Sequence, residues 1–304
     1  MNDAPPFARV AVVGLGLIGS SVVRAVQAAM PGVEVAGYDA DAGVRETARS
    51  IGLGTVGDDP VAAVSGADLV MLCVPVGAMG AAAAAIAPGL SGSAVVSDVG
   101  SCKASVAQAL REALPGATIV PAHPVAGTER SGPQAGFASL FHRRWCIVTP
   151  LADSPAPAVA RVAAFWRLFG AEVEVMAPDH HDRVLAVTSH LPHLIAYTIV
   201  GTASDLEEVT ESEVIKYSAG GFRDFTRIAA SDPTMWRDVF LHNRDAVLEM
   251  LQRFSEDLSQ LQRAIRWGKG DELFDLFTRT RAIRRGIVDQ GQDSAAADFG
   301  RQDH

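Results

Sequence analysis

Short, β-branched apolar runs alternate with stretches of helical periodicity through the first half of the chain. The first runs predict a strand at 9–13, a helix at 17–30 and a strand at 33–38. Further strands are predicted at 69–74, 94–97, 118–121, 146–149 and 172–175. Such alternation is typical of a doubly wound parallel sheet with helices on both faces. We expect the last two strands to extend the same sheet.

From residue 178 onward the strand-like runs disappear and longer helical patterns replace them. Helices are predicted at 182–203, from 232 continuously to about 267, and at 271–288. The last residues are polar and small, a composition typical of a disordered tail. The predicted organisation is therefore an α/β domain at 1–176, an all-helical domain at 177–289 and a disordered tail at 290–304.

Composition and charge narrow the classes of partner. The formal net charge of the 304 residues is −9, which argues against binding to nucleic acid or to an anionic membrane surface. Uncharged runs occur at 10–23 and 69–87, but glycines interrupt the first, and Pro75 with two glycines interrupts the second, so no membrane span is expected. Cys73, Cys102 and Cys146 are widely spaced and follow no zinc pattern, which favours reduced thiols in the cytoplasm and no metal site.

A glycine turn follows the first predicted strand. Gly14, Gly16 and Gly19 form the spacing G-x-G-x-x-G between a strand and a helix, where they allow a tight turn, close approach of a pyrophosphate and close helix packing. Asp39 ends the next strand, where a carboxylate binds ribose hydroxyls and repels a 2′-phosphate. This predicts a Rossmann-type domain that binds NAD rather than NADP; an unliganded turn with Asp39 as a capping residue is the alternative. The predicted cofactor contacts are Gly14, Gly16, Leu17, Ile18, Gly19, Asp39, Val74 and Pro75.

Polar residues cluster in three later glycine-containing segments, at 97–103, 121–129 and 220–227. The first two directly follow predicted strands, at the carboxyl edge of the sheet where doubly wound folds bind ligands. His190 and His193 lie three residues apart, but no further ligand nearby completes a metal site.

Together these stretches resemble the prephenate/arogenate (cyclohexadienyl) dehydrogenases of tyrosine biosynthesis. The matching segments are GLGLIGSS, SDVGSCK, HPVAGTE, HDRVLAVTSHLPH and GGFRDFTRIAASDPTMWRD, which span residues 14 to 238. The resemblance implies NAD-dependent oxidative decarboxylation of prephenate and/or arogenate to 4-hydroxyphenylpyruvate and/or tyrosine. It also implies that the helical domain makes most of a homodimer interface.

The resemblance assigns roles to individual residues. It implies that His123 accepts the proton of the ring hydroxyl, that Ser101 hydrogen-bonds nearby and that Arg227 binds a substrate carboxylate. It further implies substrate contacts for His193 and Arg223 and a partnership between Glu129 and a basic residue, with Arg223 as the candidate.

Without the resemblance these positions have plainer interpretations. A His-Pro pair after a strand is commonly structural, and Ser101 is a candidate N-cap for a helix at 102–114. Lys103 is expected on the surface of the first turn of that helix, and His180 and His181 at the surface or at a helix start. Trp236 is expected in packing.

Two other functions compete with this interpretation. One is a different hydroxy-acid dehydrogenase with a Rossmann and a helical domain, which would place a catalytic lysine on the helical part; Lys216 is the nearby lysine but lies outside the polar segment. The other is a non-enzymatic regulator that senses NAD(H), which would not need His123, Ser101 and Arg227 together. The sequence leaves open which of prephenate and arogenate is preferred.

Overall fold

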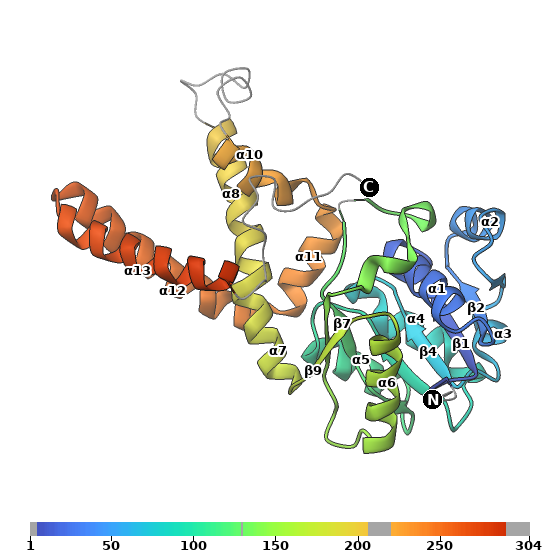
Figure 1. The fold of residues 1–304 in the computed structure, drawn as a ribbon. Coiled ribbons are helices and arrows are strands. Elements are labelled where there is room, and N and C mark those ends of the chain that lie inside the picture. Colours follow the sequence, from blue (N-terminus) through green and yellow to red (C-terminus); the bar gives the residue numbers. More distant parts are fainter. Residues whose placement is uncertain (1–4, 129, 206–219, 290–304) are drawn as a thin grey trace. The chain divides into compact units, whose positions relative to one another are not determined.

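A six-stranded parallel sheet forms the centre of the N-terminal part (Figure 1). The computed structural model describes residues 5–128, 130–205 and 220–289. The strand order β3-β2-β1-β4-β5-β6 is that of dinucleotide-binding Rossmann domains and confirms the predicted fold class. The strands lie at Arg9–Val13 (β1), Glu34–Tyr38 (β2), Thr55–Val56 (β3), Leu69–Leu72 (β4), Val95–Asp98 (β5) and Thr118–Ile119 (β6).

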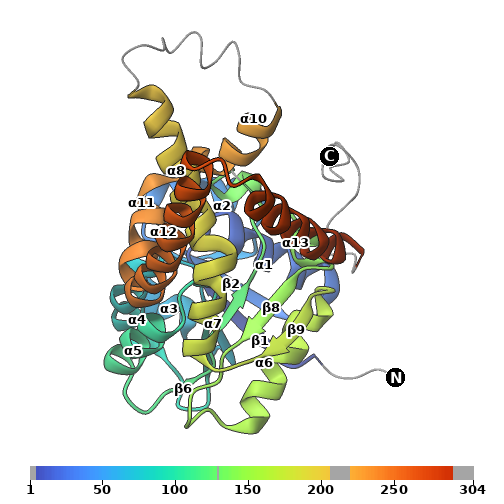
Figure 2. The same cartoon turned by 90° about the vertical axis from the view of Figure 1, so that its left-hand side faces the viewer.

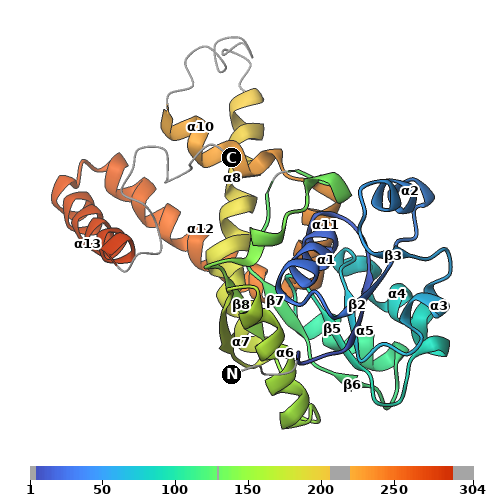
Figure 3. The ribbon, with the colours of Figure 1, turned by 45° about the vertical axis from the view of Figure 1, so that its right-hand side comes forward.

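Helices cover both faces of this sheet (Figure 3). Alternate residues of β1 enter two different cores: Val10 and Val12 pack with α1 and α6, whereas Ala11 and Val13 pack with α3, α4 and α5. A strand buried on both faces is expected for a parallel sheet. The helices lie at Leu17–Ala29 (α1), Ala42–Ser50 (α2), Pro60–Val64 (α3), Met79–Ile86 (α4), Ala104–Ala113 (α5) and Ala156–Leu168 (α6).

A second, three-stranded sheet corrects one prediction. β7 (Ala122–Pro124) pairs antiparallel with β8 (Trp145–Val148), and β8 pairs parallel with β9 (Glu172–Val175). The last two strands were expected to extend the first sheet. Instead β7 begins three residues after β6 ends, so the apolar run at 118–121 supplies only a short edge strand before the chain enters the new sheet.

Only helices occur among the described residues after β9. The predicted helix at 182–203 is observed as α7 (Pro178–Leu185), a π-helical turn (Ala186–His190) and α8 (Leu191–Ser204), which follow one another in Figure 2. The helix predicted from 232 to 267 is two helices, α11 (Pro233–His242) and α12 (Arg244–Arg266), and α13 (Gly270–Asp289) confirms the last prediction. The predicted disordered tail lies outside the described residues.

The chain divides into two compact units, residues 1–247 and 248–304. The first unit extends well beyond the parallel sheet because Trp236 and Val239 of α11 belong to the same core as α4 and α5. Among the described residues, Pro178–Ser204 is the one helical stretch whose length and composition would let it cross a membrane. Its most apolar 18-residue window has a mean hydropathy of 1.4, and 22% of that window is buried inside the protein.

Candidate active site

The glycine turn lies between β1 and α1. Gly14 has a φ of +95°, and its N–H donates to the carbonyl of Tyr38 at 2.7 Å. A Cβ on Gly14 would lie 2.5 Å from the Cys73 carbonyl oxygen and 3.0 Å from Cγ1 of Val74. A side chain is therefore excluded here, and the predicted contact Val74 borders the turn.

Gly16 and Gly19 differ in their surroundings. A Cβ on Gly19 would lie 1.8 Å from the carbonyl oxygen of Gly14, whereas a Cβ on Gly16 would meet nothing within 4 Å. Gly19 is thus needed for close packing of helix on strand, and Gly16 leaves open space at the N-terminus of α1. Backbone N–H groups at such a terminus bind anions, so these residues fit a dinucleotide pyrophosphate. Leu17 and Ile18, which open α1, are half-buried, and Pro75 is exposed just after β4.

Asp39 is held in place directly beyond β2. Its carboxylate accepts the N–H of Leu15 at 2.7 Å and the N–H of Asp41 at 2.9 Å. Arg45 donates to the carbonyls of Asp39 and Ala40 and forms an ion pair with Asp58. The carboxylate is therefore fixed beside the turn, and the nearby guanidinium is engaged by protein groups.

His123 lies on β7 and heads a buried chain of hydrogen bonds. Its Nδ1 is 2.8 Å from Nε2 of His181, and Nδ1 of His181 is 2.8 Å from Oδ1 of Asp182. The exposed fraction of His123 is 8%, and that of His181 is 0%. His181 was expected at the surface or at a helix start, and the first expectation is wrong. It does lie near the start of α7, on the face that packs inward.

Asp182 also holds the N-terminus of α5. Its two carboxylate oxygens accept the N–H groups of Lys103 at 2.7 Å and Ala104 at 2.9 Å. Ser101 is therefore not the N-cap, and α5 begins two residues later than predicted. Ser101 lies half-buried in the loop between β5 and α5.

Lys103 is buried rather than on the surface of a first turn. Its ammonium forms an ion pair with buried Asp98 and donates to the carbonyl of Ala122 at 2.8 Å. A buried lysine needs such partners because desolvation of its charge is costly. The pair ties the loop after β5 to the residue that precedes His123.

His190 and His193 occupy different environments on the same helical run. His190 is fully buried, and Asn243 donates to its Nδ1 at 3.0 Å and to the carbonyl of Asp182 at 2.8 Å. Because Nδ1 accepts, Nε2 carries the proton, and Nε2 is a buried donor without a partner among the described residues. His193 stacks on Trp236 with ring centroids 3.6 Å apart.

Arg227 lies in the 3₁₀ turn that contacts α8, the helix that carries His193. Burial lowers the pKa of His193 against the opposing hydrogen bond to Ser189, and the charge of Arg227 lowers it further. Arg223 and Arg227 are both exposed, on α10 (Gly220–Thr226) and in the 3₁₀ turn that follows. The predicted residue Glu129 lies outside the described residues, as does Lys216.

Burial keeps the three central histidines neutral. Burial lowers the pKa of His123 well below 6.5, and the neighbouring His181, Lys103 and His190 lower it further. Burial also lowers the pKa of His181 and brings that of His190 to about 4. Burial opposes ionisation of Asp182, but hydrogen bonds from His181, Ala104 and Lys103 outweigh it and lower the pKa. At neutral pH the hydrogen-bond chain thus begins with the neutral imidazole of His123 and ends with the anionic carboxylate of Asp182.

Sequence comparisons identify the family. The nucleotide-binding domain of prephenate dehydrogenase matches residues 22–175, and its dimerization domain matches residues 177–279. The chain belongs to the prephenate dehydrogenase family. This confirms the resemblance drawn from the motifs.

Individual members of the prephenate dehydrogenase family resemble the chain along most of its length. Cyclohexadienyl dehydrogenase of Zymomonas mobilis is 48% identical over 282 residues, which are 92% of this chain and 96% of that protein. Prephenate dehydrogenase of Bacillus subtilis is 31% identical and covers 90% of this chain and 74% of its own length. The crystal structure of prephenate dehydrogenase from A. aeolicus with hydroxyphenyl propionate and NAD+ has a TM-score of 0.85 at 32% identity, covering 92% of this chain and 98% of that one.

Several residues of this family member's site were missed from the sequence. His181 and Asp182 open the matching segment HDRVLAVTSHLPH but were given no catalytic or positioning role, Asn243 lies beyond the matching segments, and Lys103 was placed at the surface. A usable signal lies in α7 and the residue that follows it: His181, Asp182, Leu185 and Ala186 have the spacing of one helix face, and all four are buried. Two polar residues on an apolar helix face need partners inside the protein.

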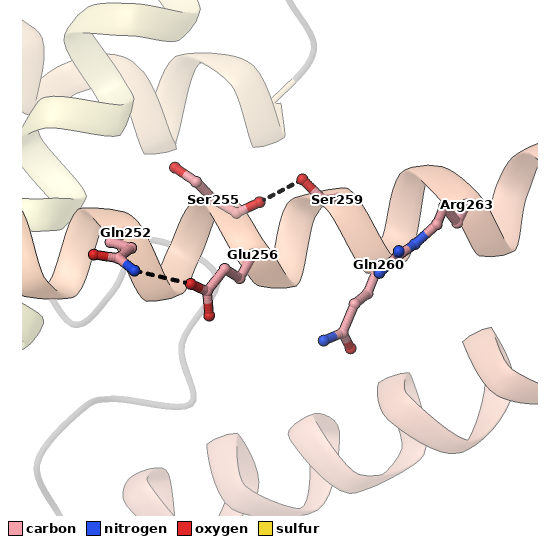
Figure 4. A pocket seen from close by; sticks show the side chains of 6 residues that line it. All are labelled: Gln252, Ser255, Glu256, Ser259, Gln260 and Arg263. Atoms are coloured by element: carbon pink, nitrogen blue, oxygen red, sulfur yellow. Dashed lines mark hydrogen bonds between the residues drawn. The ribbon is translucent and has the colours of Figure 1, made fainter.

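A hollow on α12 does not compete with this site. It is lined by exposed polar side chains; the amide of Gln252 donates to the carboxylate of Glu256, and the hydroxyl of Ser259 donates to the backbone carbonyl of Ser255 (Figure 4). It holds no buried reactive group. Among the described residues, no group of three His, Cys, Asp or Glu side chains is placed to hold a metal ion.

The buried His190 predicts a loss of stability in acid. Its pKa is about 4 in the folded protein and near 6.5 when unfolded, so the unfolded state binds the proton first as the pH falls. The free energy of unfolding should therefore decrease from about pH 6.5 down to about pH 4, by about 3 kcal/mol for this group. Urea unfolding measured across this range should show a shallower pH dependence for His190→Gln than for the wild type. The exposed His242 provides the matched control His242→Gln, and equal slopes for all three proteins would contradict the prediction.

Proposed function

We propose that the protein is an NAD-dependent dehydrogenase that oxidatively decarboxylates prephenate and/or arogenate, giving 4-hydroxyphenylpyruvate and/or tyrosine. The observation that carries the proposal is His123, a buried neutral imidazole whose Nδ1 is engaged by His181, in a chain 48% identical to a cyclohexadienyl dehydrogenase along nearly its whole length. A neutral imidazole is the side chain suited to take a hydroxyl proton near neutral pH.

NAD is the proposed cofactor. The open space at Gly16 and the N-terminus of α1 suit the pyrophosphate, and the Asp39 carboxylate suits the ribose hydroxyls. Val74 beside the turn, Pro75 after β4, and Leu17 and Ile18 at the start of α1 complete the proposed contacts. When bound, NAD accepts the hydride that leaves the carbinol carbon of the substrate ring.

The remaining residues are proposed to bind and orient the substrate. His123 accepts the proton of the ring hydroxyl as that oxygen becomes a carbonyl, and Ser101 hydrogen-bonds at the same oxygen. Arg227 binds a carboxylate, since a guanidinium makes two parallel hydrogen bonds to one. The contact between its 3₁₀ turn and α8, which carries His193, supports a shared substrate site, with Arg223 and Glu129 at its edge.

The decisive experiment is an assay of the purified protein with each substrate. Reduced cofactor should appear at 340 nm with prephenate or arogenate and NAD, together with 4-hydroxyphenylpyruvate or tyrosine by chromatography. Side-by-side kinetics with both substrates, and with NADP in place of NAD, define the preference. Absence of turnover with both substrates, in a protein that binds NAD, would refute the proposal.

We also propose that the protein is a cytoplasmic homodimer, with an NAD-binding domain at 1–176 and a helical substrate and dimerisation domain at 177–289. The match to a dimerization domain at 177–279 supports this, and a second copy would cover the apolar outer face of α8, where Ile199 and Val200 are exposed. Sedimentation equilibrium should give twice the mass of one chain. Large apolar side chains of α12, α13 and the turn between them are exposed as well: Leu248, Leu258, Ile265, Trp267, Phe274, Phe277, Ile283 and Ile287.

A further inference from the structure

We propose that His181 and Asp182 are positioning residues that hold His123 in the tautomer whose Nε2 is free to accept a proton. The proposal rests on the proposed role of His123 and adds the two residues that set its protonation state. It is carried by the buried chain of contacts from His123 through His181 to Asp182.

Asp182 determines which atoms donate and which accept along the hydrogen-bond chain. Its carboxylate accepts two backbone N–H groups at the N-terminus of α5, and the dipole of that helix favours a negative charge there. A carboxylate that is ionised can only accept hydrogen bonds. At 2.8 Å from its Oδ1, Nδ1 of His181 must therefore carry a proton.

The tautomer of His123 follows from that of His181. A neutral imidazole has one N–H, so His181 with a proton on Nδ1 presents a bare Nε2. Nδ1 of His123, 2.8 Å from that Nε2, must then be the donor. The remaining nitrogen of His123, Nε2, is left without a proton, and it makes no hydrogen bond to the described residues.

The opposite arrangement would require a charged His181. If Nδ1 of His123 were the acceptor, His181 would need protons on both nitrogens. Burial disfavours that cation and lowers the pKa of His181, against the opposing hydrogen bond to Asp182, and the ammonium of Lys103 nearby disfavours the cation further. The other groups that face this cluster are Asp98, which is paired with Lys103, and His190, which is held neutral by burial and bonded to Asn243.

Surrounding contacts keep the chain rigid. Asn243, at the break between α11 and α12, donates to the backbone carbonyl of Asp182, and Lys103 donates to the carbonyl of Ala122 beside His123. When the substrate hydroxyl gives its proton to Nε2 of His123, Nδ1 keeps its own proton. The resulting imidazolium is then stabilised through His181 by the Asp182 carboxylate, as in other acid–histidine arrangements.

Asp182→Asn tests the proposal because it removes the negative charge at the end of the hydrogen-bond chain. The amide oxygen can take the place of Oδ1, which accepts from both Lys103 and His181, so the variant keeps these contacts but loses the anion that stabilises the imidazolium of His123. We expect kcat to fall at least a hundredfold with little change in KM. The tautomer is measured directly by 15N NMR of histidine-labelled wild-type protein, in which Nε2 of His123, assigned by loss of its signals in His123→Asn, should have an unprotonated shift.

Two further variants separate positioning from folding. Asp179→Asn makes the same change at an exposed position of the same helix and should leave kcat and the His123 shifts unchanged. His181→Gln keeps Asp182 on α5 and should also lower kcat without a large change in KM, which covers the case in which Asp182→Asn fails to fold.

Wild-type 15N shifts with a protonated Nε2 on His123, or a folded Asp182→Asn protein with wild-type kcat, would overturn the inference. Because the NMR measurement needs no substrate, it still tests the tautomer if the wild type turns over neither prephenate nor arogenate, a result that would refute only the proposed function.

Discussion

Replacing His123 by asparagine is expected to lower kcat by about 10²–10⁴-fold, the range over which a positioned general base accelerates a reaction. Asparagine is polar and smaller, so it can occupy the site on β7 but cannot take a proton. NAD binding should be unchanged, because the glycine turn and Asp39 follow β1 and β2 of the other sheet. Steady-state kinetics with the preferred substrate, together with NAD titration, measure both effects.

The pH dependence of kcat/KM in the wild type is a second test of the role of His123. Burial lowers the pKa of His123 well below 6.5. Its Nε2 therefore stays unprotonated at pH 6.5 and takes a proton from solvent only at a lower pH. The acid limb of kcat/KM should therefore lie below pH 6.5, with activity lost as the pH falls through it. His180→Asn, at an exposed histidine, is the matched control and should keep wild-type kcat. A His123→Asn enzyme with more than a tenth of wild-type kcat would show that another group takes the proton.

The parallel sheet, the glycine turn and the last helix were predictable because each depends on local pattern. Runs of β-branched residues specify strands, and the spacing of Gly14, Gly16 and Gly19 requires a strand before it and a helix after it. The family resemblance likewise rests on contiguous motifs. These features need no knowledge of which distant segments meet.

The errors have the opposite origin, because they concern contacts between segments far apart in the sequence. Asp182 caps a helix that begins 78 residues earlier, so local propensity assigns that cap to Ser101. Local pattern places Lys103 at the surface of a first helical turn, whereas its partners, Asp98 and the carbonyl of Ala122, come from other segments of the chain. Asn243 interrupts a continuous helical pattern, and its side chain is engaged by Asp182 and His190.

The glycine turn supports the second prediction with a large expected effect. Gly19→Ala would place a methyl group 1.8 Å from the carbonyl oxygen of Gly14, and a backbone atom cannot move aside as a flexible side chain would. We expect the free energy of unfolding to fall by about 3 kcal/mol or more, at or beyond the upper end of ordinary overpacking. NAD binding should be lost with it, since α1 would be displaced from the strand. Urea unfolding and calorimetric titration with NAD measure the two effects.

Gly16→Ala separates the packing role of the turn from its binding role. Gly16 has a φ of −67°, which alanine adopts readily, and its added methyl meets no protein atom within 4 Å. Stability should therefore change by less than about 0.5 kcal/mol, while NAD affinity should fall about tenfold or more because the methyl occupies the space that the pyrophosphate approaches. Unchanged NAD affinity in Gly16→Ala would mean that the dinucleotide does not pass over this turn, and the assignment of the cofactor site would have to be abandoned even though the fold is that of a Rossmann domain.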